Sequence, residues 1–233
     1  MIQVTGLRKR YGRLVVLDGL DVTMRAGRVT ALVGANGAGK STLLRMLLDL
    51  ARPDAGAILI DGQAPEANPS LRTAIGYMPQ IARYPALLTG AELLAVMTRL
   101  RGVEPDLSLA QSLAVDDAIH RPFGTLSGGT RQKINAVLAF AFAPRLLLLD
   151  EPATGLDPRS ARALKDRILA ERASGTTVLI TSHVLPELEE LADDLVVLAG
   201  GRVEWTGSVV ALRERTGETT LERALIRLAE ERT

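Results

Sequence analysis

The chain has 233 residues, of which 47% are hydrophobic, so it can bury the core of one large domain and disorder is excluded. Its 28 basic and 27 acidic residues leave a net charge of +1, which excludes the broad basic surface of a nucleic-acid-binding protein. The absence of cysteine excludes a disulfide framework, a thiolate metal site and a cysteine nucleophile.

No membrane-spanning or secretory segment is predicted. The longest stretch without an acidic or basic residue, 173–186, has 14 residues, whereas a spanning helix needs about 20. The N-terminus carries charges with no apolar run after them, unlike a signal peptide. We therefore expect the chain to be cytoplasmic.

The first third of the chain has a pattern of short strands and one helix. Apolar runs at Leu14–Leu17, Val29–Val33 and Ala57–Ile60 are separated by Gly, Pro and Asp, as strands are. A glycine loop follows the second run, and Ser41–Leu50 then places leucines on one helical face. Strand, glycine loop and helix form the opening of a nucleotide-binding α/β fold.

The middle of the chain changes character at about residue 89. Residues 89–143 contain two helical patterns, Ala91–Arg101 and Arg131–Ala143, and few strand patterns. We expect a helical subdomain inserted into the sheet domain. After it, the four leucines of Leu146–Leu149 suit a parallel strand that is buried on both faces.

The last third predicts helices and strands in alternation. They are expected at Pro158–Ala173 (helix), Thr176–Thr181 (strand), Leu185–Asp193 (acidic helix), Leu195–Ala199 and Arg202–Trp205 (hairpin), and 219–232 (short C-terminal helix). The C-terminal helix is amphipathic, and packing on its own domain is favoured over a partner surface. The whole chain, 1–233, is predicted to be a single domain.

The glycine loop carries a phosphate-binding motif. Gly34-Ala-Asn-Gly-Ala-Gly-Lys40-Ser41 fits G-x-x-x-x-G-K-[ST] and stands between a strand and a helix, as that motif requires. Its backbone N–H groups and the helix N-terminus hold phosphates, Lys40 neutralises the β- and γ-phosphates, and the Ser41 hydroxyl ligates Mg²⁺. The residues predicted to bind ATP here are Gly34, Asn36, Gly37, Ala38, Gly39, Lys40, Ser41 and Thr42.

A second motif supplies carboxylates. The apolar run Leu146–Leu149 is followed by Asp150 and Glu151, which places a carboxylate at the carboxyl edge of the sheet, where Mg²⁺ is expected. Glu151 can accept a hydrogen bond from an attacking water. An apolar strand that ends in Asp is a weak signal alone, and joined to the glycine loop it strongly indicates a phosphate site with Mg²⁺ and an attacking water.

A third segment, Leu126-Ser127-Gly128-Gly129-Thr130, precedes an amphipathic helix and is similar to the signature sequence of ABC transporters. With the two motifs above, it makes the chain resemble the ATP-binding subunit of these transporters over essentially its whole length. A Ser and two Gly at a helix N-terminus form an anion-binding nest. Because Lys40 already serves the chain's own phosphates, the resemblance implies that Ser127, Gly128 and Gly129 complete the ATP site of a second copy in a head-to-tail homodimer.

The resemblance implies a fold and further site residues. The fold is that of the P-loop NTPases, an α/β fold with a RecA-like mixed sheet core, an antiparallel β part and an inserted helical subdomain. Tyr11 would stack on adenine, Gln80 would contact Mg²⁺ and the water, Asp157 would lie in a loop at the dimer seam, and His183 would contact the γ-phosphate. Thr130 departs from the usual Gln, which leaves phosphate binding intact and puts the contact with the partner in doubt.

The function implied is an ATPase that drives transport. Such a subunit lies on the cytoplasmic face of the cell membrane, contacts the membrane only through a separate transmembrane permease, and has no nucleic-acid partner. A soluble ABC-type ATPase of repair, assembly or translation is the alternative, although the coiled coil, zinc hook or second ATPase copy usual there is not visible. A metabolite kinase with the glycine loop alone would leave 126–130 and His183 unexplained.

The cargo is not determined by these motifs. The segment Ser127–Phe140 and the tail Thr216–Ala224 are similar to ATPase subunits of the copper-processing transporter that matures nitrous-oxide reductase. A generic exporter ATPase with another cargo fits comparably well. No residues of this chain are suited to bind copper, because it has no Cys and only two His.

Overall fold

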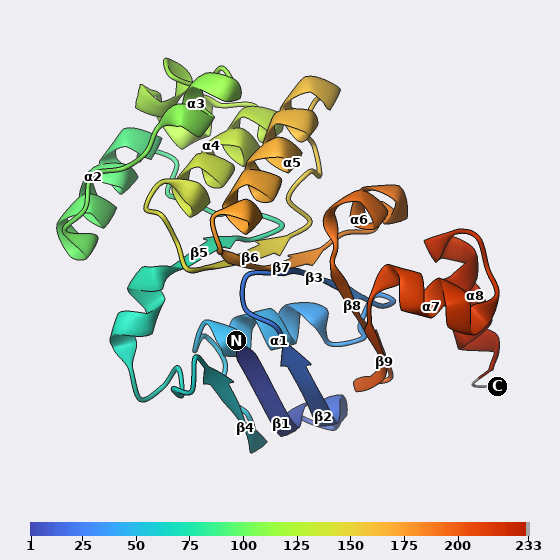
Figure 1. The fold of residues 1–233 in the computed structure, drawn as a ribbon. Helices are drawn as coiled ribbons and strands as arrows, with labels where there is room; N and C mark the ends of the chain where they lie inside the picture. Colours follow the sequence, from blue (N-terminus) through green and yellow to red (C-terminus); the bar gives the residue numbers. More distant parts are fainter. Residues whose placement is uncertain (232–233) are drawn as a thin grey trace. The chain divides into compact units, whose positions relative to one another are not determined.

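The computed structural model describes residues 1–231, which fold as two compact units (Figure 1). Unit 1 contains Met1–Asn68 and the chain from Thr181 onward, and unit 2 contains Pro69–Ile180. Residue 232, the end of the predicted C-terminal helix, lies outside the described residues. Within residues 1–231, no helix has both the length and the apolar character needed to cross a membrane.

Unit 1 contains an antiparallel sheet of three strands in the order β2-β1-β4 (Figure 1). The strands are β1 (Ile2–Tyr11), β2 (Leu14–Met24) and β4 (Ala55–Ile60). The sequence pattern did not predict β1, because its register with β2 shifts between Val4 and Leu7. The shift breaks the alternation of buried and exposed residues by which strands are identified.

Three further strands of unit 1 lie side by side in the order β3-β8-β9. The first two, β3 (Val29–Val33) and β8 (Asp194–Ala199), are parallel, and β9 (Arg202–Gly207) pairs with β8 in the antiparallel sense. Every residue of β3 is buried. The hairpin predicted around Gly200-Gly201 is confirmed, and the mixed character of the sheet agrees with the predicted fold class.

The helices described in unit 1 are α1 (Lys40–Leu47), α6 (Leu185–Leu191), α7 (Val209–Thr216) and α8 (Leu221–Glu230). Helix α1 ends before the predicted Leu50, because Asp49 adopts a left-handed conformation with φ of 54°. The C-terminal helix α8 buries Leu221, Ala224 and Leu228 and contacts α6 and α7. The tail therefore packs on its own unit, as the sequence favours.

Unit 2 has three strands in the order β5-β6-β7, with parallel pairing of β5 and β6. The strands are β5 (Ile75–Met78), β6 (Leu146–Asp150) and β7 (Thr177–Thr181), whose last residue, Thr181, is counted in unit 1. All five residues of β6 are buried, which confirms the strand predicted from its four leucines.

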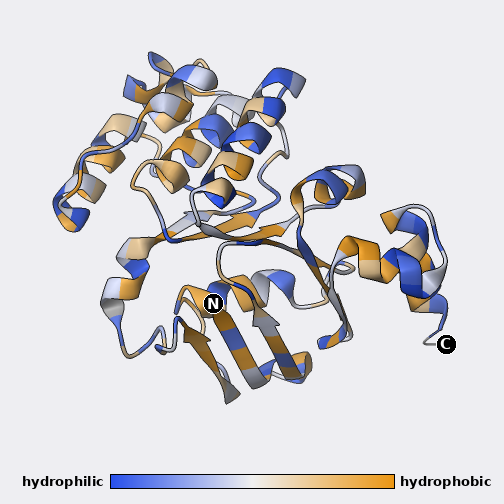
Figure 2. Ribbon diagram, viewed as in Figure 1, coloured by the Kyte–Doolittle hydropathy of each residue, from blue (hydrophilic) through white to orange (hydrophobic). Residues whose placement is uncertain are grey.

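The helices of unit 2 are α2 (Gly90–Arg101), α3 (Ser108–Ser112), α4 (Gly128–Phe140) and α5 (Pro158–Ala173). Short 3₁₀ turns occur at Pro69–Ala74, Ala118–His120 and Phe123–Thr125. Orange and blue residues alternate along α5 in Figure 2, as an amphipathic helix requires. Helix α4, which the sequence predicts to be amphipathic, is instead buried at every residue from Ile134 to Phe140. The structure groups these helices with β5, β6 and β7, so the separate helical subdomain at 89–143 stays a prediction.

Candidate nucleotide-binding site

The glycine loop lies in unit 1, between β3 and α1. Gly34 stands where the backbone of β8 comes close, since a Cβ atom built on it would lie 2.4 Å from the Leu198 carbonyl oxygen. Gly37 has φ of 82° and open space around it, as a Cβ there would meet no atom within 4 Å. Gly39 is the N-cap of α1, and because it has no side chain it leaves the first N–H groups of the helix without a capping side chain. The loop is therefore a cradle of backbone N–H groups, which suits phosphate.

The Lys40 amine lies within this loop. Its Nζ donates hydrogen bonds to the carbonyl oxygens of Gly34, at 2.5 Å, and Ala35, at 3.2 Å. Asn36 and Ser41 are exposed at the loop surface, whereas Thr42 is half-buried. An amine, a hydroxyl and backbone N–H donors form the set that a nucleotide triphosphate needs, and the Ser41 hydroxyl is a ligand type that Mg²⁺ accepts.

Tyr11 and His183 also belong to unit 1. Tyr11 ends β1 with 47% of its surface exposed, and Lys9 Nζ lies 5.4 Å from its ring centroid. His183 is exposed and follows the last residue of β7 by two positions, beside a turn in which Ser182 Oγ accepts the Val184 N–H at 3.0 Å. Both rings are accessible to a ligand.

The two carboxylates lie at the carboxyl end of β6, in unit 2. Asp150 and Glu151 are 7% and 6% exposed. Glu151 adopts a left-handed conformation with φ of 52°, which is rare for a residue other than Gly. Backbone outliers of this kind concentrate at functional sites, because the surrounding structure must hold them.

The signature segment forms the N-terminus of α4. Ser127 is the N-cap, and its Oγ accepts the Thr130 N–H at 3.1 Å and lies 2.8 Å from Thr130 Oγ1. Ser127 and Gly128 are exposed, whereas a Cβ at Gly129 would lie 3.0 Å from the Gly155 carbonyl oxygen. A Gln at this third helical position can reach back to the backbone of the N-cap residue. Thr130 is too short to do so and pairs with the Ser127 hydroxyl instead.

Asp157 connects the loop after β6 to α4. It is the N-cap of α5, where its carboxylate accepts hydrogen bonds from the Ser160 N–H, at 2.9 Å, and the Ser160 hydroxyl, at 2.7 Å. Lys133 of α4 forms an ion pair with it at 2.8 Å. The Lys133 hydrogen bond, followed by those from Ser160, holds the pKa of Asp157 well below its usual range.

The depressed pKa of Asp157 gives the stability of the protein a pH dependence. Because the unfolded Asp binds its proton more readily, the stabilising contribution is present above about pH 3.9 and is lost as the pH falls further. Asn is as good an N-cap as Asp. We therefore expect urea unfolding to show a lower free energy of unfolding for Asp157→Asn than for the wild type at pH 7, with a smaller difference at pH 3. A difference that does not change between these pH values would contradict the ion pair.

Gln80 lies in unit 2, exposed, two residues after β5. The preceding carbonyl, that of Pro79, accepts a hydrogen bond from Asn135 of α4 at 3.1 Å, and Asn135 also bonds to Tyr84. Neither Asn135 nor Tyr84 was predicted as a site residue. The available signal was a polar amide among the apolar residues of a predicted helix, in a position that proves to be fully buried.

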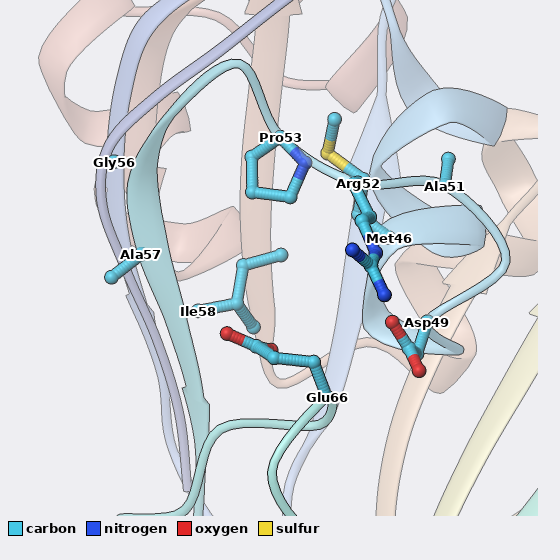
Figure 3. Close-up of a pocket in the computed structure, with 9 residues that line it drawn as sticks. All are labelled: Met46, Asp49, Ala51, Arg52, Pro53, Gly56, Ala57, Ile58 and Glu66. Atoms are coloured by element: carbon cyan, nitrogen blue, oxygen red, sulfur yellow. The ribbon is translucent and has the colours of Figure 1, made fainter.

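A cavity of about 390 Å³ lies between the end of α1 and β4, in unit 1 (Figure 3). Met46 and Ile58 are the buried apolar side chains of its lining, and Asp49, Arg52 and Glu66 add charged groups (Figure 3). None of the predicted site residues lines this cavity. It is therefore not assigned to the nucleotide.

The predicted site residues fall into two sets, one in each unit. Unit 1 holds Tyr11, Gly34, Asn36, Gly37, Ala38, Gly39, Lys40, Ser41, Thr42 and His183. Unit 2 holds Gln80, Ser127, Gly128, Gly129, Asp150, Glu151 and Asp157. Within unit 2, the structure links the signature helix to both neighbouring loops, through Asn135 to the loop of Gln80 and through Lys133 to that of Asp157.

Comparison with known proteins gives consistent matches. The family model described as ABC transporter matches residues 17–154. The daunorubicin/doxorubicin resistance ATP-binding protein of Streptomyces peucetius is 39% identical over 94% of this chain and 69% of its own length. The Nod factor export ATP-binding protein I of Ralstonia nicotianae is 36% identical over 87% of this chain and 65% of its own length. The chain thus spans about two thirds of these relatives.

Solved structures match over nearly the whole chain. An ATP-binding subunit of an ABC transporter has a TM-score of 0.92 and 29% identity, with 98% of this chain and 99% of that chain covered. An ATP-binding cassette in a dimeric post-hydrolysis state with ADP and Pi has a TM-score of 0.80, covering 90% of this chain and 99% of that one. At 21% identity, the second match shows the fold alone.

Proposed function

Because this chain belongs to the ABC transporter family, whose ATP-binding proteins hydrolyse ATP, we propose that it is the ATPase subunit of a membrane exporter. The observation that carries the proposal is the cradle of Gly34–Ser41 with the Lys40 amine held inside it. The Nod factor export relative supports an exporter in particular. A soluble ATPase of repair or assembly remains the alternative that the experiment below tests.

ATP binding follows from the family, and each residue then has a proposed role. In unit 1, the loop N–H groups and Lys40 hold the phosphates, Tyr11 stacks on adenine, and His183 contacts the γ-phosphate. Ser41, Gln80 and Asp150 offer the oxygen ligands that Mg²⁺ prefers, and the ion would neutralise the phosphate oxygens when bound. Glu151 accepts the hydrogen bond of the attacking water.

The second phosphate-binding end, at Ser127, supports a homodimer. Lys40 lies in unit 1 and Ser127 in unit 2, and each stands at the start of a helix with exposed polar groups beside it. We propose that Ser127, Gly128 and Gly129 serve the ATP of a second copy and that Asp157 lies at the seam. ATP would close the dimer, and hydrolysis would open it.

The partner in the membrane and the cargo belong to the same proposal. A transmembrane permease would hold the subunit on the cytoplasmic face of the membrane and choose the cargo. The relatives are named for drug resistance and for Nod factor export. The similarity of Ser127–Phe140 to the copper-processing transporter adds a further candidate cargo. Residues 1–231 contain no group of three His, Asp or Glu side chains that could hold a metal ion, so we propose that other subunits would handle such a cargo.

Purification of the ATP-bound form from its native cells tests the proposal. A tagged Glu151→Gln variant would be extracted in mild detergent with ATP and its partners identified by mass spectrometry. We expect a membrane protein with several spans to be recovered, and its identity would decide the cargo class. A tagged Lys40→Met variant is the matched control that separates ATP-dependent partners from the others. Recovery of soluble partners alone would favour the soluble ATPase.

A further inference from the structure

A buried amide connects α4 to the loop that carries Gln80. Asn135 is 0% exposed, and its neighbours along α4, Ile134 and Ala136, are buried and apolar. Asn135 Nδ2 donates to the Pro79 carbonyl oxygen at 3.1 Å, and Asn135 Oδ1 accepts the Tyr84 hydroxyl at 3.1 Å. One side chain therefore holds the loop at two points, five residues apart.

Tyr84 fixes the far end of this loop. Its ring stacks on Phe123, with centroids 4.4 Å apart and an interplanar angle of 26°, and Phe123 is 2% exposed. Burial raises the pKa of Tyr84 to about 12, so its hydroxyl keeps its proton and donates to Asn135 across the physiological range. Since Phe123 lies four residues before Ser127, the loop is attached to both sides of the signature segment.

The bond to Pro79 acts directly on the peptide that enters Gln80. The carbonyl group of Pro79 and the N–H of Gln80 belong to one planar peptide unit, and the Pro79 ring fixes φ on the other side. A hydrogen bond to that carbonyl therefore fixes the orientation of the peptide unit that leads into Gln80. Left unpaired, this part-buried carbonyl would favour rotation of the peptide unit toward water.

We infer that Asn135 is a positioning residue for Gln80, which it holds in the orientation needed to serve Mg²⁺ and the attacking water. The inference rests on the proposed function of Gln80. The same hydrogen bonds connect α4, the helix that begins at the signature segment, to the Gln80 loop, so a displacement of one should move the other. A solely structural Asn135 would stabilise unit 2 and leave turnover unchanged in the folded protein.

Asn135→Leu tests this, because Leu has the same heavy-atom branching as Asn and neither a donor nor an acceptor. In the full chain without ATP, we expect hydrogen exchange of the amides of Gln80–Tyr84 to be roughly tenfold faster. With ATP and Mg²⁺, we expect kcat to fall by roughly tenfold and the Mg²⁺ concentration for half-maximal activity to rise. Val137→Ala, which removes buried apolar volume from the same helix and no hydrogen bond, is the matched control and should leave exchange at 80–84 unchanged.

A double substitution separates positioning from stability. In a Gln80→Ala background, Asn135→Leu should still lower the thermal stability of the protein, because both hydrogen bonds of Asn135 are lost. It should cause no further loss of kcat. An additional tenfold loss there, or normal exchange at 80–84, would overturn the inference. If Asn135→Leu does not fold, Tyr84→Phe removes one of the two bonds and keeps the ring stack, with an expected effect of about threefold in the same direction.

The outcomes also distinguish this inference from the function on which it rests. If Gln80→Ala lowers turnover and folded Asn135→Leu does not, the inference alone fails. If Gln80→Ala has full turnover, the proposed role of Gln80 fails and the inference fails with it. If both single variants lose activity and the double variant loses no more than Gln80→Ala alone, the inference and the proposed role of Gln80 are both supported.

Discussion

Glu151→Gln is expected to lower ATP turnover by roughly 10²- to 10⁴-fold while ATP binding is retained. Glu151 lies directly after β6, where its buried carboxylate is held by a left-handed backbone conformation. Gln has the same shape, so the site should keep its structure. An amide cannot act as a base toward the attacking water, so the chemical step should become slow.

Phosphate release at saturating ATP and Mg²⁺ measures this turnover, and equilibrium binding of a fluorescent ATP analogue measures the affinity. Glu66→Gln is the matched control, because it makes the same exchange at an exposed position of the cavity lining, outside the proposed machinery. We expect that control to retain wild-type turnover. Full turnover of Glu151→Gln would refute the assignment of Glu151 as the base.

Lys40→Met is expected to weaken ATP binding by roughly ten- to a hundredfold. Met retains the length of the side chain and removes the charge that is proposed to face the phosphates. The Lys40 amine also bonds to the Gly34 and Ala35 carbonyl oxygens, so the loop itself loses two hydrogen bonds. The variant should therefore attract phosphate less strongly, and its loop should hold the phosphate-binding conformation less firmly.

Titration with ATP, followed by the rise in the unfolding temperature, measures the loss, because a ligand of the folded state stabilises it by RT ln(1 + [L]/Kd). Lys165→Met on α5 controls for the removal of a lysine charge and should bind ATP as the wild type does. Unchanged affinity of Lys40→Met would contradict the phosphate-binding role of the loop.

Local patterns made most of the site predictable. The glycine loop, Asp150-Glu151 and the Ser127 segment are each contiguous in the sequence, so their spacing alone indicates their chemistry. The helix Pro158–Ala173 and the strand Val29–Val33 were predicted with the bounds observed, because Asp157 caps the first and turn residues flank the second. These features depend on neighbours in the chain and need no tertiary information.

The features that were missed depend on tertiary structure. Tyr84 and Asn135 are 51 positions apart, and only folding brings their side chains together. Helix α7 has eight residues and buries just Val209 and Leu212, too few to establish a helical period. The carboxylate of Asp157 was assigned to the dimer seam from resemblance, whereas its ion pair with Lys133 could be found only from the coordinates.

Two glycines of the phosphate loop, Gly34 and Gly37, differ in a way that affects how a saturation mutagenesis experiment should be interpreted. A side chain at Gly34 would collide with the backbone of β8, so variants there should be cleared from the cell as misfolded protein. Variants of Gly37 have open space and only an unfavourable φ, so they should accumulate and fail in function. A growth-based score would record both positions as equally intolerant. A separate measurement of protein abundance would distinguish the two positions. Gly34 variants should be scarce, because Gly34 is needed for the packing of the sheet, whereas Gly37 variants should be abundant, because Gly37 is needed for the nucleotide.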